Sequence, residues 1–149
     1  NFKDEVFSSD GKRACLIFNA KNQMGGYGSW KVAEFKKVDG KWAIVSLEGR
    51  TENCTQSAFE AIAAGDASAG QARLEFVTLL AKGKGVSEGE ALKLSQEGRC
   101  RLAAIEYALA KGKTVESTQK KSLDSVKWWA ARVEKLEKSL AAGICEPND

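Results

Sequence analysis

WKVAEFKKVDGKWAIVSL, residues 30–47, is the stretch that decides the fold of the first third of the chain. Two runs rich in apolar and aromatic residues flank the dipeptide Asp39-Gly40. Asp-Gly between two such runs is a strong hairpin signal, because a type I′ turn needs positive φ at both central positions. The stretch therefore predicts two antiparallel strands, residues 30–38 and 41–47, joined by a tight turn.

A third strand is expected before this hairpin. Residues 14–20 form a run, ACLIFNA, whose nearly continuous apolar character is typical of a strand covered on both faces. Three glycines within residues 22–29 permit positive φ and indicate a wide or bulged hairpin loop after this run. Residues 2–7 are a further candidate for an edge strand. We expect a three- to four-stranded antiparallel β-meander within residues 1–50.

From Thr55 onward the composition favours helices, because Ala, Leu, Glu, Lys and Gln dominate and β-branched residues become rare. A short helix over residues 57–62 is expected to stop at Gly65. Asp66 is placed to cap a second helix that runs to Lys82.

Two further helices are expected after the segment Lys82 to Gly85. Ser87 followed three residues later by Glu90 is a capping box for a third helix over residues 88–111, closed by Gly112. A fourth helix is expected to start within residues 115–117 and to stop at Gly143, and a short connection makes these two helices antiparallel. The fold class is therefore α+β, a β-meander packed on a helical half over residues 55–149, in a single domain that spans residues 1–149.

Helical periodicity predicts which faces are buried. The fourth helix aligns one apolar stripe, which we expect to be core. The third helix has two apolar sides, which predicts a central helix packed on both. Trp128 lies about 100° away from its neighbour Trp129, which is in the stripe, so both cannot point into the same core. Trp128 is then either a packing contact of a second layer or an exposed anchor for a partner.

The four cysteines predict disulfides. Cys15, Cys54, Cys100 and Cys145 form no C-x-x-C pair, and the chain has no histidine, so they match neither a zinc nor a redox motif. An even count in a small chain favours two disulfides, with three pairings open. Together with a sequence that opens at Asn1, this predicts a secreted or periplasmic chain whose signal peptide has been removed. Four buried free thiols are the alternative.

Composition disfavours several function classes. Lys and Arg number 23 against 20 Asp and Glu, and the two signs are interleaved, so we expect no nucleic-acid partner. No apolar run approaches the roughly 20 residues that span a bilayer, so we expect no membrane insertion. Without histidine, and without a nucleophile, phosphate-binding or paired-carboxylate motif, we expect a non-catalytic protein without a cofactor. A small hydrolase or transferase would have to use residues such as Glu48, Glu52 or Glu60.

The aromatic residues give the candidate site. Trp30 and Trp42 flank the hairpin and are either sheet core or part of a recognition surface, since Trp and Tyr are enriched at binding hot spots. We expect a protein of the cell envelope or exterior, of an inhibitor, immunity or accessory type, that binds another protein or an envelope component; a subunit of an oligomer is the other alternative. The possible partner-binding surface comprises Tyr27, Trp30, Lys31, Lys36, Trp42 and Trp128.

Overall fold

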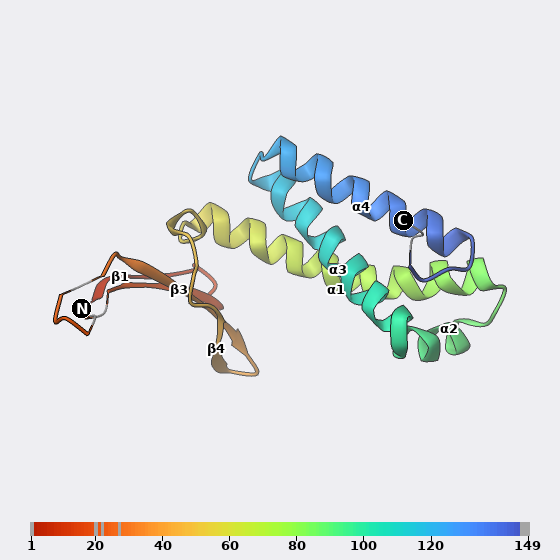
Figure 1. Cartoon of the computed structure of the whole chain (residues 1–149), viewed down its shortest axis with the longest axis horizontal. Helices are drawn as coiled ribbons and strands as arrows, with labels where there is room; N and C mark the ends of the chain where they lie inside the picture. The colour runs from red at the N-terminus through yellow and green to blue at the C-terminus, as the bar shows by residue number, and fades with distance from the viewer. Residues whose placement is uncertain (1, 20, 22, 27, 147–149) are drawn as a thin grey trace. The chain divides into compact units, whose positions relative to one another are not determined.

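The computed structural model describes residues 2–19, 21, 23–26 and 28–146, with the backbone alone at residues 2 and 3 (Figure 1). Its contacts divide the chain into two compact units, Asn1–Glu60 and Ala61–Asp149, which we call the N-terminal and C-terminal units. Each unit is described by itself. The prediction that both halves share one domain and one interior stays a prediction.

The N-terminal unit contains a four-stranded antiparallel sheet. Its strands are β1 (Phe2–Phe7), β2 (Arg13–Phe18), β3 (Lys31–Val38) and β4 (Lys41–Ser46), and they lie in the order β1-β2-β3-β4. The meander is therefore confirmed, including its edge strand.

The turn between β3 and β4 has the predicted chemistry. Asp39 has φ 51° and Gly40 has φ 77°, the two positive values that a type I′ turn requires. Val38 pairs with Lys41 directly beside the turn, and a bulge between Glu34 and Phe35 shifts the register farther along.

One face of the sheet is covered within this unit. Cys15 and Val32 pack against Cys54 and against Phe59 in the first turns of α1 (Gln56–Lys84). The disulfide between Cys15 and Cys54 joins the sheet to the segment before α1. The Gln56 side chain donates to the carbonyl of Phe7 at 2.7 Å and accepts from the backbone N–H of Ser9 at 2.9 Å. The start of α1 is thus fixed against the end of β1.

The C-terminal unit contains most of α1, followed by α2 (Glu88–Ser95), α3 (Gly98–Gln119) and α4 (Leu123–Ala141). A 3-10 turn, Thr51–Asn53, precedes α1 in the N-terminal unit. Ser87 is confirmed as the N-cap, since the backbone N–H of Glu90 donates to Oγ of Ser87 at 3.1 Å. Gly143, with φ 75°, ends α4 as expected.

Two predicted helix ends were wrong for one physical reason. Gly65 lies inside the 29-residue helix α1, and Gly112 lies inside α3. A Cβ atom built on Gly65 would lie 2.7 Å from the carbonyl oxygen of Gly112, and one on Gly112 would lie 2.6 Å from the oxygen of Gly65. These glycines allow two helix backbones to approach closely, and they terminate neither helix.

Two other predicted boundaries also moved. The expected single third helix is divided into α2 and α3 at Gln96 and Glu97, and Gly98 begins α3 with φ 51°. Because α3 continues past Gly112, α4 begins only at Leu123, several residues later than predicted.

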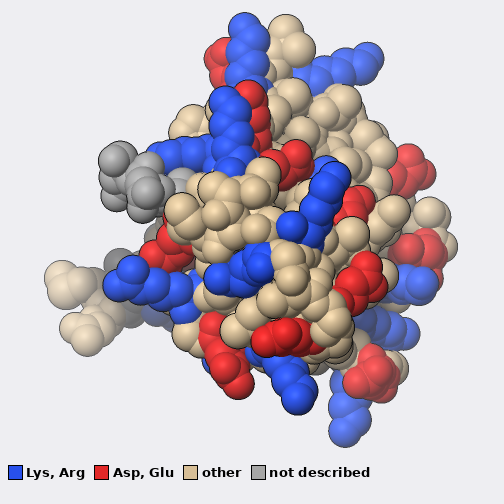
Figure 2. Space-filling view, turned by 90° about the vertical axis from the view of Figure 1, so that its right-hand side faces the viewer, with Lys and Arg blue, Asp and Glu red and all other residues tan. Residues whose placement is uncertain are grey.

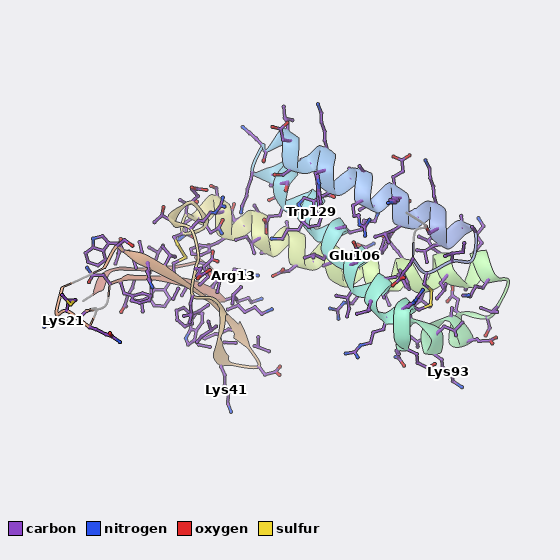
Figure 3. The ribbon with its side chains drawn as sticks, in the orientation of Figure 1. Arg13, Lys21, Lys41, Lys93, Glu106 and Trp129 are labelled. Atoms are coloured by element: carbon purple, nitrogen blue, oxygen red, sulfur yellow. A yellow bond between two sulfur atoms is a disulfide. The ribbon has the colours of Figure 1, made fainter. Side chains whose placement is uncertain are left out.

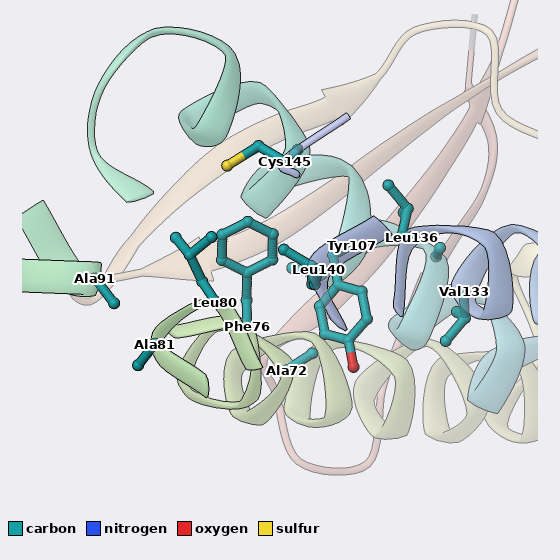
Figure 4. Packing of buried hydrophobic residues seen from close by; sticks show 13 residues of the cluster. Ala72, Phe76, Leu80, Ala81, Ala91, Tyr107, Val133, Leu136, Leu140 and Cys145 are labelled. Carbon is teal, nitrogen blue, oxygen red and sulfur yellow. The ribbon is translucent and has the colours of Figure 1, made fainter. Parts of the chain in front are cut away.

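The helices pack around one apolar cluster (Figure 4). Its largest fully buried side chains are Phe76 and Leu80 of α1, Tyr107 of α3, and Leu136 and Leu140 of α4. The predicted stripe of α4 is thus core at its C-terminal end, although Leu123 at the other end is exposed. The disulfide between Cys100 and Cys145 joins α3 to the segment after α4.

The prediction that both apolar sides of the third helix are buried was correct for one side of α3. Ala103 and Tyr107 are buried, whereas Leu102, Ile105 and Leu109 lie on the surface. The described helices pack against only part of the circumference of α3.

Candidate functional site

The face of the sheet opposite Phe59 has an apolar surface built by the strand register. Directly paired residues point to the same face, and Phe7 pairs with Ala14, Ala14 with Phe35, and Phe35 with Ile44. These four residues form one row across all four strands. Val6 and Cys15 point to the covered face, because they alternate with Phe7 and Ala14. We call the side that bears this row the outer face.

A hollow of about 280 Å³ lies on the outer face. Phe7 and Trp42 flank it with ring centroids 6.1 Å apart, and they are 52% and 43% exposed. The side-chain sticks of the N-terminal unit are drawn in Figure 3. The residues that line the hollow are Glu5, Phe7, Ala14, Cys15, Leu16, Phe35 and Trp42.

One lysine lies over Trp42 at the hollow, and a second lies opposite that lysine on the neighbouring chain segment. Lys37 pairs with Trp42, and its Nζ lies 5.2 Å from the centroid of the indole ring, a cation–π distance. The backbone N–H of Lys37 donates to the carbonyl of Lys12 at 2.8 Å. Because Arg13 pairs with Lys36, the register places Lys12 opposite Lys37 and therefore toward the outer face.

The nearest acidic group to Lys12 in sequence has its own partners. The Asp10 carboxylate accepts from the hydroxyl of Ser8 at 2.6 Å and from the backbone N–H of Lys12 at 2.9 Å. The Ser8 hydrogen bond, and then that of Lys12, lower the pKa of Asp10 below its ordinary value. The ionised Asp10 side chain therefore accepts hydrogen bonds within the turn between β1 and β2.

The structure separates the residues that the sequence grouped into one surface. Trp42 and Lys31 point to the outer face, whereas Lys36, which pairs with Arg13, points to the opposite one. Trp30 lies just before β3, is 48% exposed and does not line the hollow. Tyr27 lies outside the described residues.

The alternative in which Trp30 and Trp42 are sheet core was wrong, since both are exposed. For Trp42, the physical reason is that it points to the outer face, while Phe59 and the Cys15–Cys54 disulfide cover the other face of the sheet. Trp30 lies outside the strands, just before β3.

Trp128, in the C-terminal unit, is an exposed side chain. It is 62% exposed, and its ring meets that of Trp129 edge-on with centroids 4.6 Å apart. Trp129 packs against the apolar cluster. Of the two alternatives for Trp128, the exposed position agrees with the role of an anchor for a partner, and packing of Trp128 against the N-terminal half stays a prediction.

Sequence reasoning missed Phe7, Leu16 and Phe35, which line the hollow with Trp42. It also missed Lys37, which lies over Trp42, and Lys12 opposite Lys37. The signal for them was present in the hairpin turns. Once Asp39-Gly40 fixes the pairing of β3 with β4, Lys37 falls opposite Trp42 and Phe35 lies on the same face.

A polar cluster joins the three long helices around a second hollow of about 510 Å³. The Tyr107 hydroxyl donates to Oε1 of Glu137 at 3.2 Å. Nζ of Lys111 lies 3.3 Å from Oε2 of Glu75 and 3.9 Å from Oε1 of Glu137. Burial and then the charge of Glu137 raise the pKa of Tyr107 well above its ordinary value. The lysine and both carboxylates already pair with one another, so this cluster holds helices together.

The sequence candidates for metal binding and acid–base chemistry lie in disulfides or on the surface of the described part of the chain. All four cysteines are in disulfides. In the described ranges, no group of three or more cysteine, aspartate or glutamate residues is placed to hold a metal ion. Glu48, Glu52 and Glu60 are each exposed. That the protein is not an enzyme stays a prediction.

The surface charges are mixed where they can be seen. On the face drawn in Figure 2, basic and acidic side chains are interspersed, and neither sign gathers into a patch. Among the described helices, none is long and apolar enough to cross a membrane.

No protein-family model, curated protein or solved structure matches this chain.

Proposed function

We propose that this chain is an exported, non-catalytic binding protein that attaches to a partner protein through the outer face of its sheet. The proposal depends on one observation. A four-stranded sheet has one face covered by its own chain, and the other face presents the apolar row of Phe7, Ala14, Phe35 and Ile44 beside Trp42.

The composition of this face supports binding. The solvated face of an antiparallel sheet is usually polar, with apolar residues alternating toward the core. Here Ile44 is 62% exposed, and Phe7 and Trp42 border a hollow lined mainly by apolar side chains. Contiguous exposed apolar surface with aromatic residues is typical of protein interaction sites.

The disulfides support the proposed location. Both are formed, and they tie down segments 39 and 45 residues apart in the sequence. Disulfides persist in oxidising compartments such as the periplasm and the cell exterior, and glutathione and thioredoxin keep thiols reduced in the cytosol. They are therefore consistent with an oxidising, extracytoplasmic compartment, and we propose secretion or periplasmic export on this basis.

Quantitative affinity capture from envelope and extracellular fractions tests the proposal. We expect Trp42→Ala to reduce the recovered partner at least ten-fold, because central aromatic residues at interfaces contribute about 2 kcal/mol or more. Trp30→Ala is the matched control, since Trp30 has similar exposure and lies outside the hollow. Equal recovery with wild type and Trp42→Ala would exclude the outer face. Loss with Trp128→Ala alone would assign binding to the C-terminal unit.

A structural subunit is the second candidate, favoured by the exposed side of α3. This side carries exposed apolar residues at helical spacing: Leu102, Ile105 and Leu109. In an oligomer, the same side of another copy of the chain could cover them. Light scattering at high protein concentration tests this function. A dimer that Ile105→Glu dissociates would support it, and a monomer would exclude it.

A further inference from the structure

We propose that the partner element that fits the outer face is an acidic peptide segment carrying one large apolar side chain. This inference rests on the proposed function and deepens it, because it names the chemistry of the partner. The hollow, the two lysines and the position of Glu5 each support it.

The hollow fits one apolar side chain. Its volume of about 280 Å³ lies just below the range of roughly 300–1,000 Å³ typical of drug-sized ligand sites. Phe7, Leu16, Phe35 and Trp42 supply apolar and aromatic walls. An inserted Phe or Leu side chain would remove these walls, and itself, from water.

The lysines favour carboxylates next to that side chain. In the part of the chain that the structure describes, Lys37 has no carboxylate within ion-pair distance, and its Nζ lies over the Trp42 ring. Lys12 is exposed and lies opposite Lys37. A partner carboxylate beside Trp42 would therefore meet the ammonium group of Lys37, which no described carboxylate pairs with. The charge of Lys12, which also acts on Asp10, would add to this attraction.

Glu5 gives the two ends of the hollow charges of opposite sign. It lines the hollow and lies on β1, opposite Leu16, whereas Lys37 and Trp42 lie on β3 and β4. The acidic residues of a bound segment are thus expected near β3 and β4 and away from β1. A concave site with charges at one end favours a discrete side chain over the flat surface of a lipid bilayer.

Peptide titration followed by NMR tests the inference on the full chain. The probe is the peptide acetyl-EEFEE-amide, and the readout is the indole N–H resonance of Trp42 in ¹⁵N-labelled protein. The control peptides are acetyl-KKFKK-amide and acetyl-EEGEE-amide. We expect saturable shifts with the first peptide, weaker ones at high salt, and much weaker binding of both controls.

Lysine variants, with a matched control, test which lysines attract the acidic residues of the peptide. We expect Lys37→Gln and Lys12→Gln each to weaken binding of acetyl-EEFEE-amide about two- to five-fold, the range for exposed ion pairs. Lys36→Gln is the control, because this residue adjoins Lys37 on the same strand but points to the other face. It should leave the affinity unchanged. Thermal melting of each variant verifies that it is folded.

The outcomes separate this inference from the proposed function. Equal binding of acetyl-KKFKK-amide, or equal losses with Lys36→Gln and Lys37→Gln, would overturn the acidic partner while leaving the outer face in place as the docking surface. Co-sedimentation with phosphatidylglycerol vesicles in the absence of peptide binding would overturn it in favour of lipid. Partner capture that is insensitive to Trp42→Ala would instead refute the proposed function, whatever the peptides do.

Discussion

Substituting Gly65 by Ala tests the close approach of α1 and α3. An added Cβ would lie 2.7 Å from the carbonyl oxygen of Gly112 and 3.1 Å from Cβ of Glu116. Because the first of these atoms belongs to a helix backbone, it cannot swing away as the end of a flexible side chain would. One of the two helices must shift.

The expected change in the free energy of unfolding follows from two opposing effects. Replacing Gly by Ala within a helix stabilises it by roughly 0.5–1 kcal/mol. Overpacking a tight contact costs about 1–3 kcal/mol. We therefore expect Gly65→Ala to lower the free energy of unfolding by about 1 kcal/mol, within a range of about 0–2.5 kcal/mol, and the melting temperature by about 2–4 °C for each kcal/mol.

Gly70→Ala is the matched control for this prediction. Gly70 lies five residues farther along α1, and a Cβ built there meets nothing within 4 Å. Only the helix-propensity effect applies, so this variant should be more stable than wild type by about 0.5–1 kcal/mol. Urea unfolding of both variants measures the difference. If Gly65→Ala stabilised the protein as much as Gly70→Ala, the helix contact would not be close and the reasoning would be refuted.

Three further predictions concern the disulfides, Tyr107 and Trp128. Replacing Cys15 and Cys54 together by Ser should lower the free energy of unfolding by up to about 4 kcal/mol, the chain-entropy effect for a separation of 39 residues; an unchanged urea midpoint would count against this. The raised pKa of Tyr107 means that its stabilising effect is complete below its ordinary pKa of 10.0 and is lost as pH rises above that value. Urea unfolding at alkaline pH should therefore show a loss of stability that is smaller in Tyr107→Phe, and equal losses would contradict the assignment. Acrylamide should quench wild-type emission more than that of Trp128→Phe, because Trp128 is exposed; the same quenching in both would mean that Trp128 is shielded.

The sequence predicted those parts of the fold that depend on local chemistry. The Asp39-Gly40 turn and the Ser87 N-cap each depend on a few neighbouring residues, and both formed as expected. Gly65 and Gly112 were misjudged because glycine serves both as a helix terminator and as a site of close helix approach. Only the packing of α1 on α3 distinguishes these two uses.

The sequence located the aromatic residue at the centre of the candidate site, but not the residues that surround it. The hairpin located Trp42, yet which face of the sheet is open depends on Phe59 and on the pairing of Cys15 with Cys54. That pairing was one of three possibilities. It follows from spatial proximity, with Cα atoms 5.7 Å apart for Cys15–Cys54 and 5.0 Å apart for Cys100–Cys145, which spacing along the sequence does not reveal.

Covalent footprinting of the captured complex is the most direct test of the central claim that the outer face of the sheet is the docking surface. The chain is labelled with a photoactivated carbene reagent, alone and with its partner bound, and modified residues are identified by mass spectrometry. We predict strong protection of Phe7, Ile44 and Trp42 on partner binding, with Trp30 labelled equally in both states. Unchanged labelling of Phe7, Ile44 and Trp42, with protection confined to other surfaces, would contradict the claim.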